Sequence, residues 1–127
     1  MRPKDKDGKI PKHRGSKLKI TEEKRNDAVI CFIEGEININ NAPELRKAFD
    51  GIISRSEKKV IVDFSAVSYI DSSGLATLIE MFQRLKKIGG RMRFANMDQK
   101  IKNVFEITKL HKLFEIFDTQ ESALKEF

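Results

Sequence analysis

The chain has 127 residues, of which 35% are charged, and a formal net charge of +6. This length suits a single domain, which at this size buries roughly two-thirds of its surface and needs neither a disulfide nor a metal to be stable. No apolar run approaches the ~20 residues of a membrane span, and the basic N-terminus lacks the apolar centre of a signal peptide, so we expect no membrane span and a cytoplasmic protein.

The positive charge is concentrated at the start of the chain. Residues 1–25 contain 10 Lys/Arg and 4 Asp/Glu, whereas residues 26–127 contain 15 of each. Residues 1–15 show no helical or strand periodicity, so we predict a disordered basic arm there and one domain over residues 16–127. A basic arm can contact phosphates or acidic lipids. The neutral domain and the lack of interleaved aromatic residues argue against direct nucleic-acid binding.

The first half of the predicted domain reads as a hairpin and a helix. Two alternating stretches, "KLKITEE" and "AVICFIEG", flank the turn "RND" and predict a β-hairpin over residues 17–35. Asn40 or Asn41 can cap the next helix, and apolar residues at helical spacing predict that it spans residues 42–54. Cys31 is the only cysteine. We expect it to be buried in the second strand, and we find no cysteine or histidine pattern for a metal.

The second half alternates strands and helices. The run "VIVDFS" is apolar on both faces of the pleat, which indicates a central strand over residues 59–64. After a short loop, a helix from Ser73 ends at Gly89–Gly90. The strand "RMRFANM", a helix capped by Asp98 whose apolar residues include Ile107, the strand "KLFEIFDT" and a short final helix follow. This order predicts an α/β fold: a mixed, mostly parallel sheet of about five strands with about four helices.

The segment Asp71–Gly74, "DSSG", contains more polar residues than a helix start requires. One cap stabilises a helix by about 1 kcal/mol, and a glycine in the first turn costs up to about 1 kcal/mol. One interpretation is structural: a cap, with Gly74 allowing close approach of a neighbour. The other is regulatory. A phosphate on Ser72 would add nearly two negative charges at the positive end of the helix dipole, so the fold would tolerate it while a docked partner would be repelled.

The stretch "VIVDFSAVSYIDSSGLATL" resembles the STAS family, and in particular the free-standing bacterial anti-sigma factor antagonists. The likeness covers about residues 17–127 and includes Gly35, Val67 and Gly89–Gly90. It implies an anti-sigma factor antagonist that binds an anti-sigma factor which is also an ATP-dependent serine kinase, and so frees a sigma factor. The kinase phosphorylates the first serine after the aspartate, here Ser72, and a phosphatase restores the unmodified form.

The resemblance also implies where the partner binds. Asp71 orients and caps, Ser72 accepts the phosphate, and Ser73 with Gly74 keeps the helix start compact. The expected partner-binding residues are Asn38, Ile39, Asn40, Asn41, Asp71, Ser72, Ser73, Gly74 and Leu75. The chain departs from the family at "GEIN", where Asn38 replaces a common aspartate and removes a negative charge near the docking face.

The sequence also allows an enzyme or a non-switching module. Ser72, His111 and either Asp71 or Asp63 supply the residue types of a catalytic triad, but no Gly-x-Ser-x-Gly elbow or nucleotide-binding motif is present, so we expect no enzyme and no cofactor. His111 is expected to face solvent. The alternative is a non-switching STAS scaffold, or a soluble subunit of a stress-signalling or membrane lipid-transport complex. The intact "DSSG" favours the switch, and we expect a monomer.

Overall fold

The computed structural model describes residues 18–127, so the predicted arm over residues 1–15 lies outside the described residues. The elements in chain order are β1 (Lys19–Arg25), β2 (Ala28–Ile37), α1 (Ala42–Ser54), β3 (Lys59–Ile70), α2 (Ser72–Lys87), β4 (Arg91–Ala95), α3 (Gln99–Ile107), the 3-10 helix η2 (Leu110–Lys112), β5 (Glu115–Phe117) and α4 (Gln120–Leu124). This is the predicted order of strands and helices.

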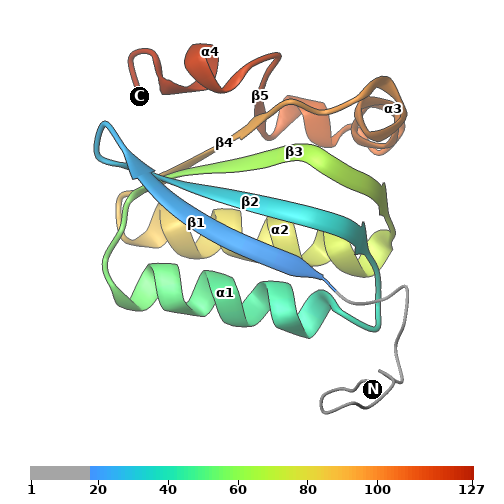
Figure 1. Cartoon of the computed structure of the whole chain (residues 1–127), viewed down its shortest axis with the longest axis horizontal. Helices are drawn as coiled ribbons and strands as arrows, with labels where there is room; N and C mark the ends of the chain where they lie inside the picture. The colour runs from blue at the N-terminus through green and yellow to red at the C-terminus, as the bar shows by residue number, and fades with distance from the viewer. Residues whose placement is uncertain (1–17) are drawn as a thin grey trace, which may run out of the picture.

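The five strands form one sheet in the sequential order β1-β2-β3-β4-β5. β1 pairs antiparallel with β2, and each later pair is parallel, which confirms the predicted mixed sheet. Figure 1 shows α1 and α2 side by side against one face of the sheet and α4 on the opposite face. The carboxyl ends of β2 and β3 therefore meet the first turns of α1 and α2 at the same edge of the sheet.

The first hairpin and first helix follow the sequence closely. Asn26 and Asp27 have positive φ angles of 50° and 69°, as a two-residue hairpin turn with a right-handed strand twist requires. α1 spans the predicted residues and begins after Asn41. The Asn41 side chain makes no capping hydrogen bond to this helix, however; it turns back toward the preceding loop.

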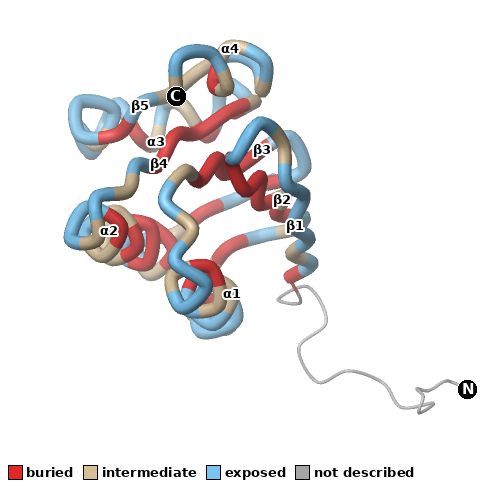
Figure 2. Tube along the Cα trace, turned by 90° about the vertical axis from the view of Figure 1, so that its left-hand side faces the viewer, coloured by how far each residue is buried: buried red, intermediate tan, exposed pale blue. Residues whose placement is uncertain are grey.

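The main core lies between the sheet and the two helices α1 and α2, where buried residues line the strands and the inward sides of the helices (Figure 2). Cys31 is fully buried in it, as predicted. Burial, followed by the negative charge of Glu22, raises the pKa of its thiol to about 12. Four phenylalanine rings from β3, β4, α3 and the loop before β5 meet in this core at centroid distances of 4.8–6.1 Å; they are Phe64, Phe94, Phe105 and Phe114.

The opposite face of the sheet holds two buried charged side chains under α4. Arg93, 6% exposed, donates from Nη1 to the carbonyl oxygens of Ala123 and Lys125, both at 2.8 Å. Asp63, 2% exposed, accepts hydrogen bonds from Asn96 Nδ2 at 2.8 Å and Gln120 Nε2 at 3.0 Å. The C-terminal segment is therefore fastened to the sheet by polar contacts as well as by a small apolar cluster.

Several predicted details are wrong. β4 ends at Ala95 rather than at Met97, and α2 begins one residue early, at Ser72. The strand expected over residues 59–64 continues to Ile70, so no loop precedes Asp71. The last strand contains only Glu115–Phe117 of the expected residues 112–119, because η2 includes Lys112 and the turn after it continues to Phe114, whose N–H donates to the Leu110 carbonyl oxygen at 3.0 Å. Ile107, one of the apolar residues named for α3, is 80% exposed. It lies two residues after the buried Phe105, which is about 200° around the helix and therefore on the opposite side.

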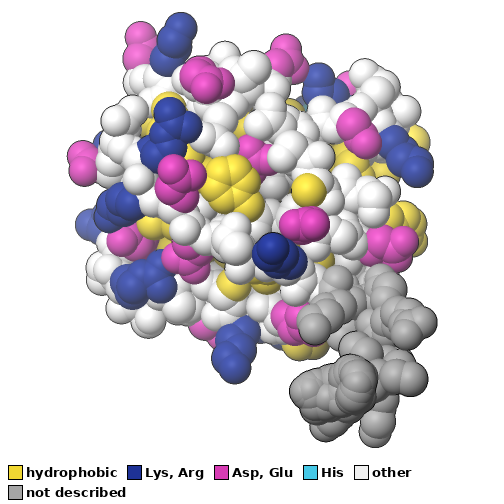
Figure 3. Space-filling model, in the orientation of Figure 1, with side chains coloured by type: hydrophobic (Ala, Val, Ile, Leu, Met, Phe, Trp, Pro, Cys, Tyr) yellow, Lys and Arg dark blue, Asp and Glu magenta, His cyan; other side chains and the backbone are white. Residues whose placement is uncertain are grey.

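The surface of the described domain carries both signs of charge. Figure 3 shows Lys/Arg and Asp/Glu side chains interspersed over the face seen in Figure 1. Charged side chains of the domain also pair with one another, such as Lys24 with Glu57 at 2.7 Å and Arg46 with Glu80 at 2.6 Å. This distribution agrees with the balanced charge of residues 26–127 and gives the face in view no basic field.

Candidate partner-binding site

Asp71 connects the end of β3 directly to the start of α2. Its backbone is extended (φ −105°, ψ −175°), and its Oδ1 accepts a hydrogen bond from the backbone N–H of Gly74 at 3.0 Å. A short acidic side chain in this geometry satisfies one of the N–H groups that a helix leaves free at its start. Asp71 therefore caps α2, as the resemblance implies.

The second carboxylate oxygen of Asp71 joins α2 to the loop between β2 and α1. Asp71 Oδ2 accepts a hydrogen bond from the backbone N–H of Ile39 at 3.0 Å, across 32 positions of sequence. The Asp71 N–H in turn donates to the carbonyl oxygen of Ile37 at 3.0 Å. One residue thus holds together the two segments expected to form the docking surface. No local sequence pattern indicates this bridge, although parallel pairing of the two strands would place their ends side by side.

The two serines differ in exposure. Ser72 is the first residue of α2 and is exposed, and within residues 18–127 its hydroxyl makes no hydrogen bond. Ser73 is half-buried, and its carbonyl oxygen accepts a hydrogen bond from Thr77 Oγ1 at 3.0 Å. Of the pair, Ser72 is the hydroxyl more open to a reagent from solution.

Three of the expected partner-binding residues are buried. Asn41 is 0% exposed and Leu75 8% exposed, and Gly74 is also buried. A Cβ at Gly74 would lie 2.6 Å from Ile37 Cγ2, so only glycine fits between α2 and the end of β2. These three residues lie beneath the exposed residues of the site and support them. The surface that the site offers consists of Asn38, Ile39, Asn40, Asp71, Ser72 and Ser73.

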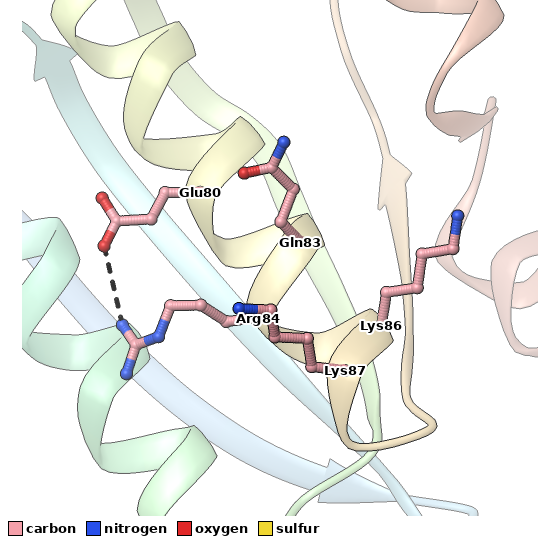
Figure 4. A pocket seen from close by; sticks show the side chains of 5 residues that line it. All are labelled: Glu80, Gln83, Arg84, Lys86 and Lys87. Carbon is pink, nitrogen blue, oxygen red and sulfur yellow. Dashed lines mark ion pairs between the residues drawn. The ribbon is translucent and has the colours of Figure 1, made fainter.

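A shallow hollow lies farther along α2, between the side chains that Figure 4 shows. Its lining residues are Glu80, Gln83, Arg84, Lys86 and Lys87. Glu80 lies 3.9 Å from Arg84 and also pairs with Arg46 of α1. The hollow begins about 12 Å from Ser72 along the helix, and four of its five lining residues are charged.

Of the triad candidates among residues 18–127, Asp71 is next to Ser72 but uses both carboxylate oxygens on backbone N–H groups. In the described part of the chain no hydrogen bond links Ser72 with Asp63 or with His111, which is exposed as predicted. Residues 18–127 contain no cluster of three or more His, Cys, Asp or Glu suited to a metal ion. No helix among the described residues is both long and apolar enough to cross a membrane.

Comparison with known proteins identifies the family to which this chain belongs. A family model described as the STAS domain matches residues 19–123, which is most of the chain. The protein therefore belongs to the STAS domain family. The predicted resemblance is confirmed, and the β3–α2 junction with its "DSSG" lies inside the matched region.

Individual relatives have the names expected from the resemblance. The anti-sigma-B factor antagonist of Bacillus subtilis is 30% identical over 73% of this chain and 84% of its own length. The anti-sigma-B factor antagonist of Listeria monocytogenes is 28% identical, over 74% of this chain and 82% of its own. The crystal structure of an anti-sigma factor antagonist from Mycobacterium paratuberculosis matches with a TM-score of 0.79 at 25% identity, covering 86% of this chain and 92% of that one.

Proposed function

We propose that this protein is an anti-sigma factor antagonist. It binds an anti-sigma factor that is also a serine kinase, and so frees a sigma factor in the cytoplasm. Phosphorylation of Ser72 by that kinase ends the binding, and a phosphatase restores it. The observation that carries the proposal is the exposed hydroxyl of Ser72 beside Asp71, which links α2 to the Asn38–Asn41 loop. The names of the Bacillus and Listeria relatives support this class of partner.

The charge distribution of the site explains why a phosphate there would act as a switch. Residues 37–43 carry no charged side chain, and in residues 71–76 only Asp71 is charged. None of the ion pairs within residues 18–127 involves either segment. A phosphate on Ser72 would bring nearly two negative charges into a docking surface that is otherwise almost neutral. No cation of the site would neutralise it.

The fold itself would tolerate the modification. Ser72 is at the positive end of the α2 dipole, where a negative charge is favourable by about 0.3–1 kcal/mol. Its side chain is exposed, so a phosphate needs no buried space. The consequence of phosphorylation would therefore fall on the contact with the partner and not on the stability of the domain.

The test uses the anti-sigma factor kinases of the same organism, each purified and mixed with this protein. One of them should bind the unmodified protein without ATP and release it when ATP is supplied. Mass spectrometry should then place the phosphate on Ser72. Ser72→Ala should bind and stay bound in ATP, and Ser72→Asp should fold normally and bind weakly, whereas the control Ser73→Ala should still be phosphorylated.

Two results would contradict the proposal. Equal binding of Ser72→Asp and the unmodified protein would exclude charge repulsion as the mechanism. The absence of any phosphate on Ser72, in protein isolated from resting and from stressed cells, would favour the non-switching scaffold or transport-subunit function, with "DSSG" acting only as a cap and docking edge.

A further inference from the structure

The loop between β2 and α1 is held rigidly by hydrogen bonds. Each backbone N–H from Asn38 to Ala42 donates to an acceptor within the site. The five bonds are Asn38 N to Asn41 Oδ1 (2.9 Å), Ile39 N to Asp71 Oδ2 (3.0 Å), Asn40 N to Asn38 Oδ1 (2.9 Å), Asn41 N to Asn38 O (3.1 Å) and Ala42 N to Asn38 O (2.8 Å). A loop whose donors are all satisfied in this way has little freedom to rearrange.

This rigid loop presents a large apolar side chain to solvent. Ile39 is 69% exposed. Single exposed apolar residues are common on protein surfaces, so exposure alone indicates nothing. Ile39 differs from the similarly exposed Ile107 of α3, which is 80% exposed, because its backbone is fastened to Asp71, the residue immediately before Ser72.

The surroundings of Ile39 are polar but nearly uncharged. Ile39 lies between the neutral Asn38 and Asn40, and its hydrogen-bond partner Asp71 is followed by the neutral Ser72 and Ser73. Both carboxylate oxygens of Asp71 are already engaged by backbone N–H groups. Apolar side chains within an uncharged polar rim are typical of the centres of protein interfaces. Because the loop is already ordered, burying Ile39 in a partner would cost little conformational entropy.

We propose that Ile39 is the apolar anchor of the partner contact and inserts into an apolar pocket of the anti-sigma factor kinase. Asp71 positions it by holding its backbone N–H. This inference rests on the proposed function and specifies the chemistry of the partner surface. An apolar anchor at Ile39 also explains the effect of a phosphate on Ser72. The doubly charged phosphate beside the apolar contact would have to lose its water for the contact to form, and this desolvation would weaken binding.

Calorimetric titration of the purified kinase without ATP tests the anchor with a matched pair of variants. Ile39→Ala should weaken binding by about 10- to 100-fold, the usual effect of truncating an interface anchor. Ile107→Ala, the same substitution at an exposed isoleucine of α3, should leave the dissociation constant within about twofold. In the phosphorylation reaction, Ile39→Ala should raise KM for this protein with kcat unchanged, because Ile39 binds the partner without contacting the reacting groups.

The possible outcomes separate this inference from the proposed function. If the unmodified protein binds none of the organism's anti-sigma factor kinases, the proposed function fails and the anchor fails with it. If the unmodified protein binds and Ile39→Ala binds equally well, the anchor assignment is wrong while the function stands. An equal loss in Ile39→Ala and Ile107→Ala would also overturn the assignment, and unchanged thermal unfolding of both variants shows that they are folded.

Discussion

Gly74 and Gly51 both lie in helices but differ in the space around them. A Cβ at Gly74 would be 2.6 Å from Ile37 Cγ2 and 2.8 Å from Ile70 Cγ1, whereas at Gly51 the nearest atom is Arg55 Nη1 at 3.5 Å. We expect Gly74→Ala to lower the free energy of unfolding by about 1–3 kcal/mol through overpacking. Gly51→Ala should raise it by about 0.5–1 kcal/mol through reduced backbone entropy.

Urea denaturation of both variants measures this difference. The two substitutions are chemically identical, so a helix-propensity effect alone would shift them in the same direction. Equal stabilisation of both would contradict the close packing of α2 on the end of β2. A destabilised Gly74→Ala would show instead that the glycine of "DSSG" is required by the fold, separately from any role in switching.

At the scale of elements, the sequence predicts best where periodicity is uninterrupted. The bounds of α1 were predicted because its apolar spacing and Pro43 mark one helix. The end of β3 was missed because two register shifts against β2 each insert an extra residue and break the two-residue alternation. That stretch therefore resembles a loop in sequence while it still pairs with β2 as far as Ile70.

The candidate site was predicted in part for the same reason. Local chemistry predicts that Asp71 or a serine caps the helix, and the family resemblance implies Asp71. Asp71 is the cap, and Ser72 is the first helical residue. The burial of Asn41 and the bridge from Asp71 to Ile39 depend on contacts between distant segments. Such contacts leave no periodic pattern in the sequence, so a reading of local spacing cannot find them.

The end of α3 provides a second stability prediction. Lys109 follows this helix with a left-handed φ of 65°, which costs a residue with a Cβ roughly 1 kcal/mol or more. Lys109→Gly should therefore raise the free energy of unfolding by about 0.5–1 kcal/mol. Lys100→Gly, in the first turn of the same helix, should lower it by up to about 1 kcal/mol. Thermal unfolding of the two variants provides the measurement, and destabilisation by both would contradict the strained cap.

At the scale of the whole molecule, Asp63 links the sheet to the C-terminal segment. It also makes the free energy of unfolding depend on pH. Burial alone would raise the pKa of Asp63, but hydrogen bonds from Ser65, Gln120 and Asn96 outweigh it and lower this pKa. A lowered pKa in the folded state stabilises the protein above the unfolded value of about 3.9. The stabilisation is lost as the pH falls through that value toward the folded one.

We expect the contribution of Asp63 to the free energy of unfolding to be nearly constant above about pH 5. Below about pH 4 this contribution should fall as the pH falls. Asp63→Asn should show a shallower fall. It should also be less stable at pH 7 by about 1–3 kcal/mol, because an amide group would face donors from Asn96 or Gln120. Urea titrations from pH 7 to pH 3 measure both effects. Parallel curves for the two proteins would show that Asp63 does not carry the acid sensitivity.

Asp63 binds the C-terminal segment at Gln120, and Arg93 binds it nearer the end of the chain. Besides the carbonyl oxygens of Ala123 and Lys125, it contacts Glu115 through Nε at 3.0 Å and lies over the Phe127 ring at 4.5 Å. A lysine cannot reproduce this fork of donors. Arg93→Lys should therefore lower the free energy of unfolding by about 1–3 kcal/mol and make residues 118–127 more sensitive to a protease of low specificity.

Arg91 on the same strand is a matched control, because it also pairs with Glu115, at 2.8 Å, but is exposed. Arg91→Lys should change stability by less than about 1 kcal/mol, as surface ion pairs do. If both variants lost the same stability and the C-terminal segment remained protected in each, the shared contact with Glu115 would account for the effect. A selective loss in Arg93→Lys would show that one buried guanidinium holds the last helix on the face of the sheet opposite α1 and α2.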